Sequence, residues 1–162
     1  IKLANCHPRV NVLTPGVGVG GHCIAVDPWF IHEVFEDITP LIYEARVIND
    51  GKPAWTADRV AQEVKPGAKI AVLGLSFKPD IDDTRESPSL EFARLLKARG
   101  YEVCACEPNI QGDVEEFRNY SLEQAMADCD YAVITLAHSY FKSHKDLIAA
   151  KPYYDCVGLM RA

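Results

Sequence analysis

The chain has 162 residues, of which 48% are hydrophobic and 25% charged, a balance typical of a soluble globular protein with one good core. Its formal net charge of −6 argues against a nucleic-acid surface, because phosphates are neutralised by clustered Lys and Arg. The sequence shows no apolar run near the ~20 residues of a membrane-spanning helix and no secretory signal. We therefore expect a cytoplasmic protein that binds neither nucleic acid nor membrane.

The first segment leads directly into an unusual loop, "GVGVGGHC", at residues 16–23. A start this abrupt is expected of a piece of a longer chain. Glycines allow a close backbone approach to a ligand, and Cys23 after them is a candidate nucleophile, metal ligand or ordinary buried thiol. Further ligands at recognisable spacing are missing, so we expect no metal. No strand precedes the loop, so it is not a Rossmann phosphate loop.

Two helical stretches follow this loop. Asp27 and Pro28 suit the N-cap and first position of a helix. Apolar residues then recur at helical spacing over residues 41–64, with a break or kink expected from Gly51 to Pro53. Such a helical hairpin or long kinked helix packs either on a partner subunit or on its own domain, and the sequence leaves both open.

From residue 67 onward, strand and helix patterns alternate. Ser87 and Pro88 suit the start of a helix that Gly100 would end. The alternation predicts an α/β fold, a Rossmann-like parallel sheet with right-handed crossovers. The expected strands are 69–77, 101–108, 130–138 and 154–160, and the expected helices are 87–100, 121–129 and 142–150.

The cysteines of this second half fit a core. With no export signal, all six thiols of the chain are expected to be reduced. Cys104 and Cys106 flank one alanine in a strand pattern, and we expect them on opposite faces of that strand, which disfavours a shared metal. Together with Cys129 and Cys156 they are interpreted as small buried hydrophobic residues.

A charged loop, "GLSFKPDIDDTRESP", follows the first expected strand. Ligands of open parallel sheets bind beyond the carboxyl ends of the strands, and the helix that starts after this loop offers free N–H groups suited to phosphate. Lys78 and Arg85 are therefore binding candidates, although a solvated, self-neutralising loop is the alternative. GxGxxG is absent here, so this half need not hold a dinucleotide in the usual way.

Two motifs together indicate a family. "PGVGVGGHCIAVDPWF" and "GLSFKPDIDDTRESPSLEFA", linked by "ARVINDGKP", resemble the UDP-glucose/GDP-mannose dehydrogenase family from about residue 5 to the end. Where members acting on UDP-glucose have Pro-Lys-Asp, this chain has Ala25-Val26-Asp27. The resemblance therefore implies UDP-N-acetyl-D-mannosamine as substrate. UDP-N-acetylglucosamine, UDP-glucose or GDP-mannose are alternatives, as is a non-catalytic UDP-binding or dimerisation module.

The resemblance also implies a division of the chain into three parts. Residues 1–27 would end the catalytic segment and carry the nucleophile loop, residues 28–66 would form a central helical dimerisation region, and residues 67–162 would form a C-terminal Rossmann-like domain that binds the UDP-sugar. The NAD domain and the family's catalytic lysine and asparagine would lie upstream. A homodimer or higher homo-oligomer through the central helices is expected.

The chemistry that the resemblance implies is oxidation of a primary alcohol to a carboxylate, with two NAD per turnover. Cys23 would be the nucleophile that forms a thiohemiacetal and then a thioester, and Asp27 would position the water or the base. Substrate contacts would come from both halves of the chain, and Arg85 would reach NAD. The implied substrate-binding residues are His7, Arg9, Gly20, Phe77, Lys78 and Arg161, with His7 and Arg9 lent to a neighbouring subunit.

Overall fold

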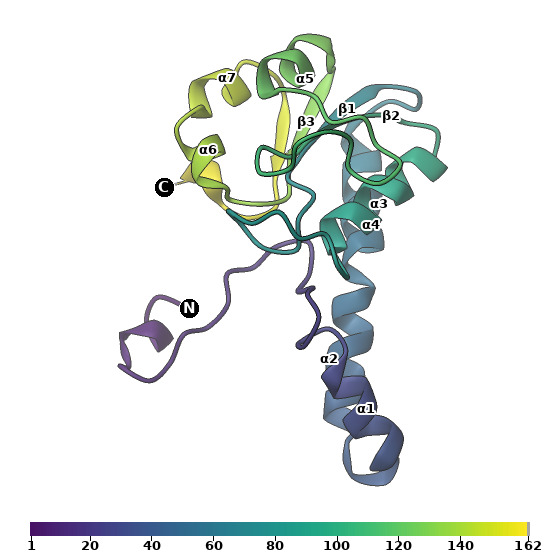
Figure 1. The fold of residues 1–162 in the computed structure, drawn as a ribbon, viewed down its shortest axis with the longest axis vertical. Coiled ribbons are helices and arrows are strands. Elements are labelled where there is room, and N and C mark those ends of the chain that lie inside the picture. The colour runs from purple at the N-terminus through teal and green to yellow at the C-terminus, as the bar shows by residue number, and fades with distance from the viewer. Residues whose placement is uncertain (162) are drawn as a thin grey trace.

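A parallel sheet forms the centre of the computed structural model, which describes residues 1–161 (Figure 1). The strand order is β2-β1-β3-β4, and every neighbouring pair is parallel, with Ile70 of β1 opposite Val103 of β2 and Tyr131 of β3. The Rossmann-like α/β fold predicted from the alternating pattern is confirmed. The strands are β1 (Lys69–Leu73), β2 (Glu102–Cys106), β3 (Tyr131–Ile134) and β4 (Tyr153–Asp155).

Helices connect the strands, and two of them start with the caps that the sequence predicts. The Ser87 hydroxyl accepts a hydrogen bond from the Leu90 N–H at 3.3 Å, and Ser121 forms a capping box with Gln124. Gly100, with φ of 85°, follows the first of these helices. The connecting helices are α4 (Pro88–Ala98), α5 (Leu122–Asp128), α6 (Ser139–Lys142) and α7 (Lys145–Ala149).

Hydrophobic side chains cover both faces of the sheet. Ile70 and Val72 of β1 pack with α4 and with Val60 of a preceding helix, α3 (Lys52–Glu63). Ala71 and Leu73, which point the other way, pack against α5 and α7. The strands therefore lie between two helical layers, and their carboxyl ends are left for loops.

The expectation for Cys104 and Cys106 is wrong. Both thiols lie in the same hydrophobic cluster, under α5, because residues two apart in a strand point to the same face. Burial raises the pKa of Cys104 to about 11 and that of Cys106 to about 12. Both therefore remain protonated, buried thiols, as the sequence predicts for their role in the core.

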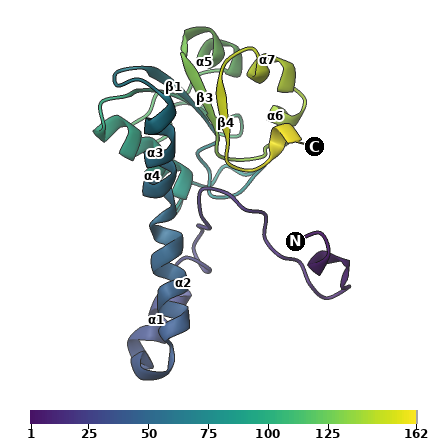
Figure 2. The same ribbon diagram turned by 180° about the vertical axis from the view of Figure 1, so that it is seen from behind.

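Two further helices, α1 (Asp27–Val34) and α2 (Pro40–Asp50), precede α3. The Gly51 N–H donates to the Val47 carbonyl at 3.0 Å, and the Trp55 N–H donates to the Gly51 carbonyl at 3.1 Å. Hydrogen bonding thus continues through the predicted break, and α2 and α3 follow one another as a long rod that projects from the sheet (Figures 1 and 2). Short 3-10 turns lie at Ala4–Cys6, Glu36–Ile38 and Leu159–Arg161.

Several predicted boundaries differ from the structure. Asp27 is the first residue of α1, which Val26 precedes without a side-chain cap. The helix expected at 142–150 is interrupted, because the Ser143 hydroxyl donates to the Tyr140 carbonyl at 2.8 Å and satisfies a group that a continuous helix would use. The strands are shorter than predicted because pairing stops where the loops turn away, as after Leu73.

The first 14 residues extend away from the sheet and are exposed (Figure 2). Within residues 1–161, no helix is both long and apolar enough for a membrane span.

Candidate functional site

The glycine loop packs tightly on the segment that joins β1 to α4. A Cβ on Gly20 would lie 2.1 Å from the Glu86 carbonyl oxygen, and a Cβ on Gly21 would lie 2.9 Å from the Phe77 ring. Gly21 also has φ of 96°, which L side chains rarely adopt, and its N–H donates to the Arg85 carbonyl at 3.3 Å. These two glycines therefore bring the loop before α1 against the loop after β1.

A pocket of about 510 Å³ lies where the two loops meet the carboxyl ends of β1 and β3. Gly20 and Ile24 line it from the glycine loop, Phe77 and Lys78 from the charged loop, and Leu136 from the segment after β3. The structure thus brings together three of the residues predicted to bind substrate, at the sheet edge where open α/β folds bind ligands.

Cys23 directly precedes the pocket-lining residue Ile24 and is exposed, but it does not itself line the pocket. Its carbonyl accepts hydrogen bonds from the Val26 N–H at 3.0 Å and the Asp27 N–H at 2.8 Å. This turn sets Asp27 one helical turn after Cys23, at the start of α1, where it is also exposed. The nucleophile and the acid predicted to assist it are therefore local neighbours.

Arg85 brings a positive charge near Cys23. Its guanidinium forms an ion pair with Asp83 at 2.5 Å, and it is 63% exposed. Hydrogen bonds from Arg85 lower the pKa of Asp83 to about 2, and Asp83 in turn raises the pKa of Arg85, with a smaller electrostatic contribution from Cys23. The positive charge near Cys23 is therefore paired with the Asp83 carboxylate.

His7, Arg9 and Arg161 are not brought into the pocket that holds Lys78. His7 and Arg9 lie in the exposed N-terminal segment, where the Arg9 N–H donates to His7 Nδ1 at 3.3 Å. Arg161 lines a separate pocket of about 350 Å³ together with Lys52 and Trp55. The assignment of these three residues to substrate binding stays a prediction.

Sequence reasoning missed the residues of α2 that hold the glycine loop. Asn49 makes two hydrogen bonds to the backbone of Val19: its Oδ1 accepts from the N–H at 2.8 Å and its Nδ2 donates to the carbonyl at 3.0 Å. Arg46, buried and paired with Asp50 at 2.5 Å, donates to the Ile24 carbonyl at 3.4 Å. Val19 precedes Cys23 by four residues, and Ile24 follows it directly. Polar residues within the otherwise apolar helical pattern of "ARVIND" were the available signal.

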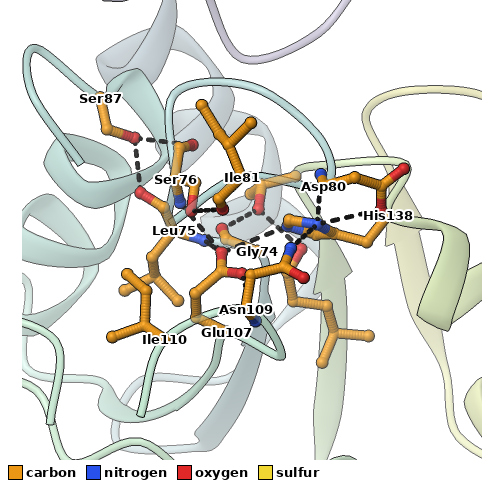
Figure 3. A network of polar contacts seen from close by, with 12 residues as sticks. Gly74, Leu75, Ser76, Asp80, Ile81, Ser87, Glu107, Asn109, Ile110 and His138 are labelled. Atoms are coloured by element: carbon orange, nitrogen blue, oxygen red, sulfur yellow. Dashed lines mark hydrogen bonds and ion pairs between the residues drawn. The ribbon is translucent and has the colours of Figure 1, made fainter. Parts of the chain in front are cut away.

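A second missed residue is Glu107, which follows β2 and is 1% exposed (Figure 3). Its carboxylate accepts hydrogen bonds from the N–H groups of Leu75 at 2.8 Å and Ser76 at 3.0 Å. In a dinucleotide-binding Rossmann fold, the turn after the first strand approaches the phosphates. Here the N–H groups of that turn are bonded to the protein's own carboxylate, so the turn does not form a dinucleotide cradle.

Within residues 1–161, no cluster of three or more His, Cys, Asp or Glu side chains has a geometry suited to a metal ion. The site is thus a thiol, two cations and a glycine-lined pocket at the carboxyl edge of the sheet. This arrangement defines a Rossmann-like α/β ligand-binding domain that presents an exposed cysteine beside its pocket.

Comparison with known proteins identifies the family. Residues 71–162 match the UDP-binding domain of the UDP-glucose/GDP-mannose dehydrogenase family, and residues 1–51 match its central domain. The chain belongs to the UDP-glucose/GDP-mannose dehydrogenase family.

Its relatives include UDP-N-acetyl-D-mannosamine dehydrogenase of Campylobacter jejuni, 45% identical over 87% of this chain and 37% of that protein. NDP-N-acetyl-D-galactosaminuronic acid dehydrogenase of Ralstonia solanacearum is 41% identical over 100% of this chain and 40% of that protein. The solved UDP-D-ManNAc dehydrogenase of Pyrococcus horikoshii superposes with a TM-score of 0.83 at 36% identity, over 98% of this chain and 40% of that one. The chain thus spans less than half of the length of these relatives.

Proposed function

We propose that the chain is the nucleophile-bearing and UDP-binding part of an NAD-dependent dehydrogenase that converts UDP-N-acetyl-D-mannosamine to the corresponding uronate. The observation that carries the proposal is the pocket of about 510 Å³, in which the loop of the exposed Cys23 meets Lys78. The UDP-binding family match and the name of the Campylobacter jejuni relative support this substrate class. As a biosynthetic enzyme of nucleotide sugars, the protein would act in the cytoplasm.

In the proposed reaction, Cys23 is the nucleophile. Its thiolate adds to the carbonyl carbon of the aldehyde formed from the sugar alcohol, and the carbonyl oxygen takes up the electron pair and a proton. After oxidation to a thioester, water adds to the carbonyl carbon and the thiolate leaves with its electron pair. Asp27, one helical turn from Cys23, would orient that water. Arg85 supplies positive charge beside the thiolate.

NAD would accept the hydrides in the proposed reaction. The N–H groups after β1 are bonded to Glu107 and so do not form a dinucleotide cradle. The residues of this chain therefore fit only a peripheral contact with NAD. Arg85, which is 63% exposed, is the residue proposed for that contact, since its guanidinium suits a pyrophosphate or amide oxygen. The principal NAD site would belong to another part of the protein.

Substitution of the nucleophile tests the proposed reaction in the full-length enzyme. Cys23→Ser should reduce the rate of uronate release by about a thousandfold or more, because a hydroxyl replaces the thiolate that carries the acyl group. Cys6→Ser is the matched control, since Cys6 is also an exposed thiol and lies outside the pocket. Uronate release by Cys23→Ser at the normal rate would contradict the nucleophile assignment.

A panel of sugar nucleotides tests the substrate. UDP-N-acetyl-D-mannosamine should give the highest kcat/KM, and the named activity of the Ralstonia solanacearum relative makes UDP-N-acetyl-D-galactosamine the sharpest competitor. UDP-N-acetylglucosamine, UDP-glucose and GDP-mannose complete the panel. Binding of UDP without oxidation of any of these sugars would instead favour a non-catalytic UDP-binding module.

We also propose that the central helices form the interface of a homodimer. Leu41, Ile48 and Trp55 recur every seven residues along the α2–α3 rod and are 82%, 69% and 49% exposed. A stripe at this spacing is suited to packing between helices. The other side of α3 buries Ala57 and Val60 against the sheet, so the rod would link the dimerisation region, proposed as residues 28–66, to the domain at 67–162. His7 and Arg9, on the exposed N-terminal segment, would then reach a neighbouring subunit's site.

Sedimentation measurements test this interface. The double variant Leu41→Asp/Ile48→Asp should sediment as a monomer at a concentration at which the wild type is a dimer, because buried unpaired charges oppose association. Ala149→Asp, on the exposed side of α7, adds charge to a helix outside the stripe and should leave the dimer intact. A dimer that survives the double variant would place the interface elsewhere.

A further inference from the structure

The loop that carries Lys78 is tied to the body of the protein by a buried polar network (Figure 3). Its centre is formed by Glu107, at the end of β2, and His138, after β3, which are 1% and 0% exposed. Burying two titratable side chains is costly unless polar partners compensate for the lost water. The partners in this case are groups of the loop at residues 74–83.

Glu107 fixes the start of this loop. Its Oε2 accepts the N–H groups of Leu75 and Ser76, and its Oε1 accepts the Asn109 N–H at 3.1 Å. Burial opposes ionisation of this carboxyl group, but the interactions with His138 and the two backbone N–H groups outweigh burial and lower the pKa of Glu107. A charged carboxylate therefore holds the backbone immediately before Phe77.

His138 fixes the far side of the same loop. The Asp80 N–H donates to His138 Nδ1 at 2.9 Å. A backbone N–H can only donate, so Nδ1 is the acceptor in this hydrogen bond, and Asn109 Nδ2 lies 2.9 Å from the same nitrogen. Nε2 lies 3.2 Å from Glu107 Oε2, without the alignment of a full hydrogen bond. The imidazole thus stands between Glu107 and Asp80 and joins the two ends of the loop.

Asp80 is held from a second direction by the start of α6. Its carboxylate accepts the Ser139 N–H and the Ser139 hydroxyl, each at 2.7 Å, and these bonds lower the pKa of Asp80. The backbone of Asp80 has φ of 63°, a conformation that costs energy for any residue except glycine. Hydrogen bonds to both its amide and its carboxylate stabilise this conformation.

Ser76 and Asp80 bracket Lys78, and both are fixed to the network, whereas Lys78 itself is exposed and lines the pocket. We propose that Asp80, His138 and Glu107 are positioning residues, which hold the backbone of Lys78 so that its ammonium group meets the diphosphate of a bound UDP-sugar. A fixed backbone lowers the ordering cost of binding. This inference rests on the proposed function, because it assigns the pocket beside Lys78 to the UDP-sugar.

The test is a double-mutant cycle on UDP affinity, measured by calorimetry with the full-length protein. Asp80→Gly removes the carboxylate and suits the φ of 63°, so it releases the loop without straining the backbone. Asp80→Gly and Lys78→Ala should each weaken UDP binding about tenfold, and the double variant should bind no more weakly than Lys78→Ala alone. Asp80→Asn keeps an acceptor for the Ser139 N–H and should restore affinity to within about threefold of the wild type.

Asp82→Gly is the matched control, because Asp82 is an exposed carboxylate in the same loop; its UDP affinity should stay within about twofold of the wild type. His138→Ala would remove a fully buried ring and could disturb folding as well as positioning. The substitutions are therefore made at Asp80, which is exposed. A purely structural role predicts that Asp80→Gly lowers the unfolding temperature and leaves the Kd for UDP unchanged, and that result would overturn the inference.

Multiplicative losses in the double variant, about a hundredfold in total, would also overturn it, because Asp80 would then act independently of Lys78. A full-length wild type that fails to bind UDP would overturn the proposed function, and the positioning role with it. A wild type that binds UDP, together with an insensitive Asp80→Gly, would overturn the positioning role alone.

Discussion

The first 50 residues and the sheet domain bury their apolar side chains very differently. Val17 and Ala25 are the buried hydrophobic residues among positions 1–50, whereas the other core residues of the described chain lie at position 57 or beyond. Leu41, Ile38 and Val34 are each at least 70% exposed. The sheet domain is thus stabilised by its own core, while the first part depends on a few hydrogen bonds between its glycine loop and its helix α2 and on surfaces that are suited to a partner.

The largest expected effect is in the core of the sheet domain. Phe92→Ala should lower the free energy of unfolding by about 3–5 kcal/mol, because Phe92 is fully buried between α4 and the sheet and its loss leaves a cavity. Phe30→Ala removes the same ring from the exposed side of α1 and should change the unfolding of the monomer by no more than about 0.5 kcal/mol. Urea unfolding at low protein concentration measures both, and equal losses would contradict the contrast between the two regions.

A smaller effect is expected within the first region, where α2 holds the glycine loop. Asn49→Ala removes both hydrogen bonds to Val19 and should reduce the local stability of the glycine loop by about 1–3 kcal/mol. Amide hydrogen exchange of Val19 should therefore become about tenfold faster or more, with little change in the sheet.

Asn5 provides the control for this measurement. It makes a similar pair of hydrogen bonds, to the backbone of Val12 at 2.6 and 3.4 Å, but within the exposed N-terminal segment. Asn5→Ala should leave the exchange of the glycine loop unchanged. Fast exchange of Val19 in the wild type would show that Asn49 does not hold the loop.

Thiol labelling tests the same contrast between the two regions in the wild-type protein, without a destabilising substitution. Cys6 and Cys23, both in the first region, are exposed, whereas Cys104, Cys106 and Cys129 are buried. Cys156 is half-buried, and burial raises its pKa to about 12. At pH 8 the native protein should therefore show two fast-reacting thiols, and all six should react in denaturant. Cys23→Ser should remove one of the fast thiols. Rapid labelling of a third thiol would indicate that the sheet domain opens.

Alkaline pH should lower the free energy of unfolding of the sheet domain. The effect should be smallest near neutral pH. The pKa of Cys106 is raised by burial from 9.0 to about 12, so the folded state retains a proton that the unfolded state releases. This contribution to stability is complete below pH 9 and is lost as the pH rises toward about 12. Urea midpoints between pH 8 and 11 should fall, and Cys106→Ala should reduce the fall. An equal fall in that variant would assign the effect to other groups.

Part of the candidate site could be predicted from the sequence. The loop context indicated Lys78, the family resemblance implied Gly20 and Phe77, and the pocket brings the three together. His7, Arg9 and Arg161 lie outside that pocket, and their assignment to substrate binding stays a prediction. The Cys104 and Cys106 expectation failed through a misreading of strand periodicity rather than through missing information.

The sequence by itself determined the fold class, the caps at Ser87 and Ser121, and the position of the glycine loop that carries Cys23, because these depend on residues close together in the chain. Only the tertiary structure decided how the loops are held. Asn49 meets Val19 across 30 positions, and His138 meets Asp80 across 58. Each of these side chains is an ordinary polar residue in its local pattern, and its role follows from partners that chain folding alone brings within hydrogen-bonding distance.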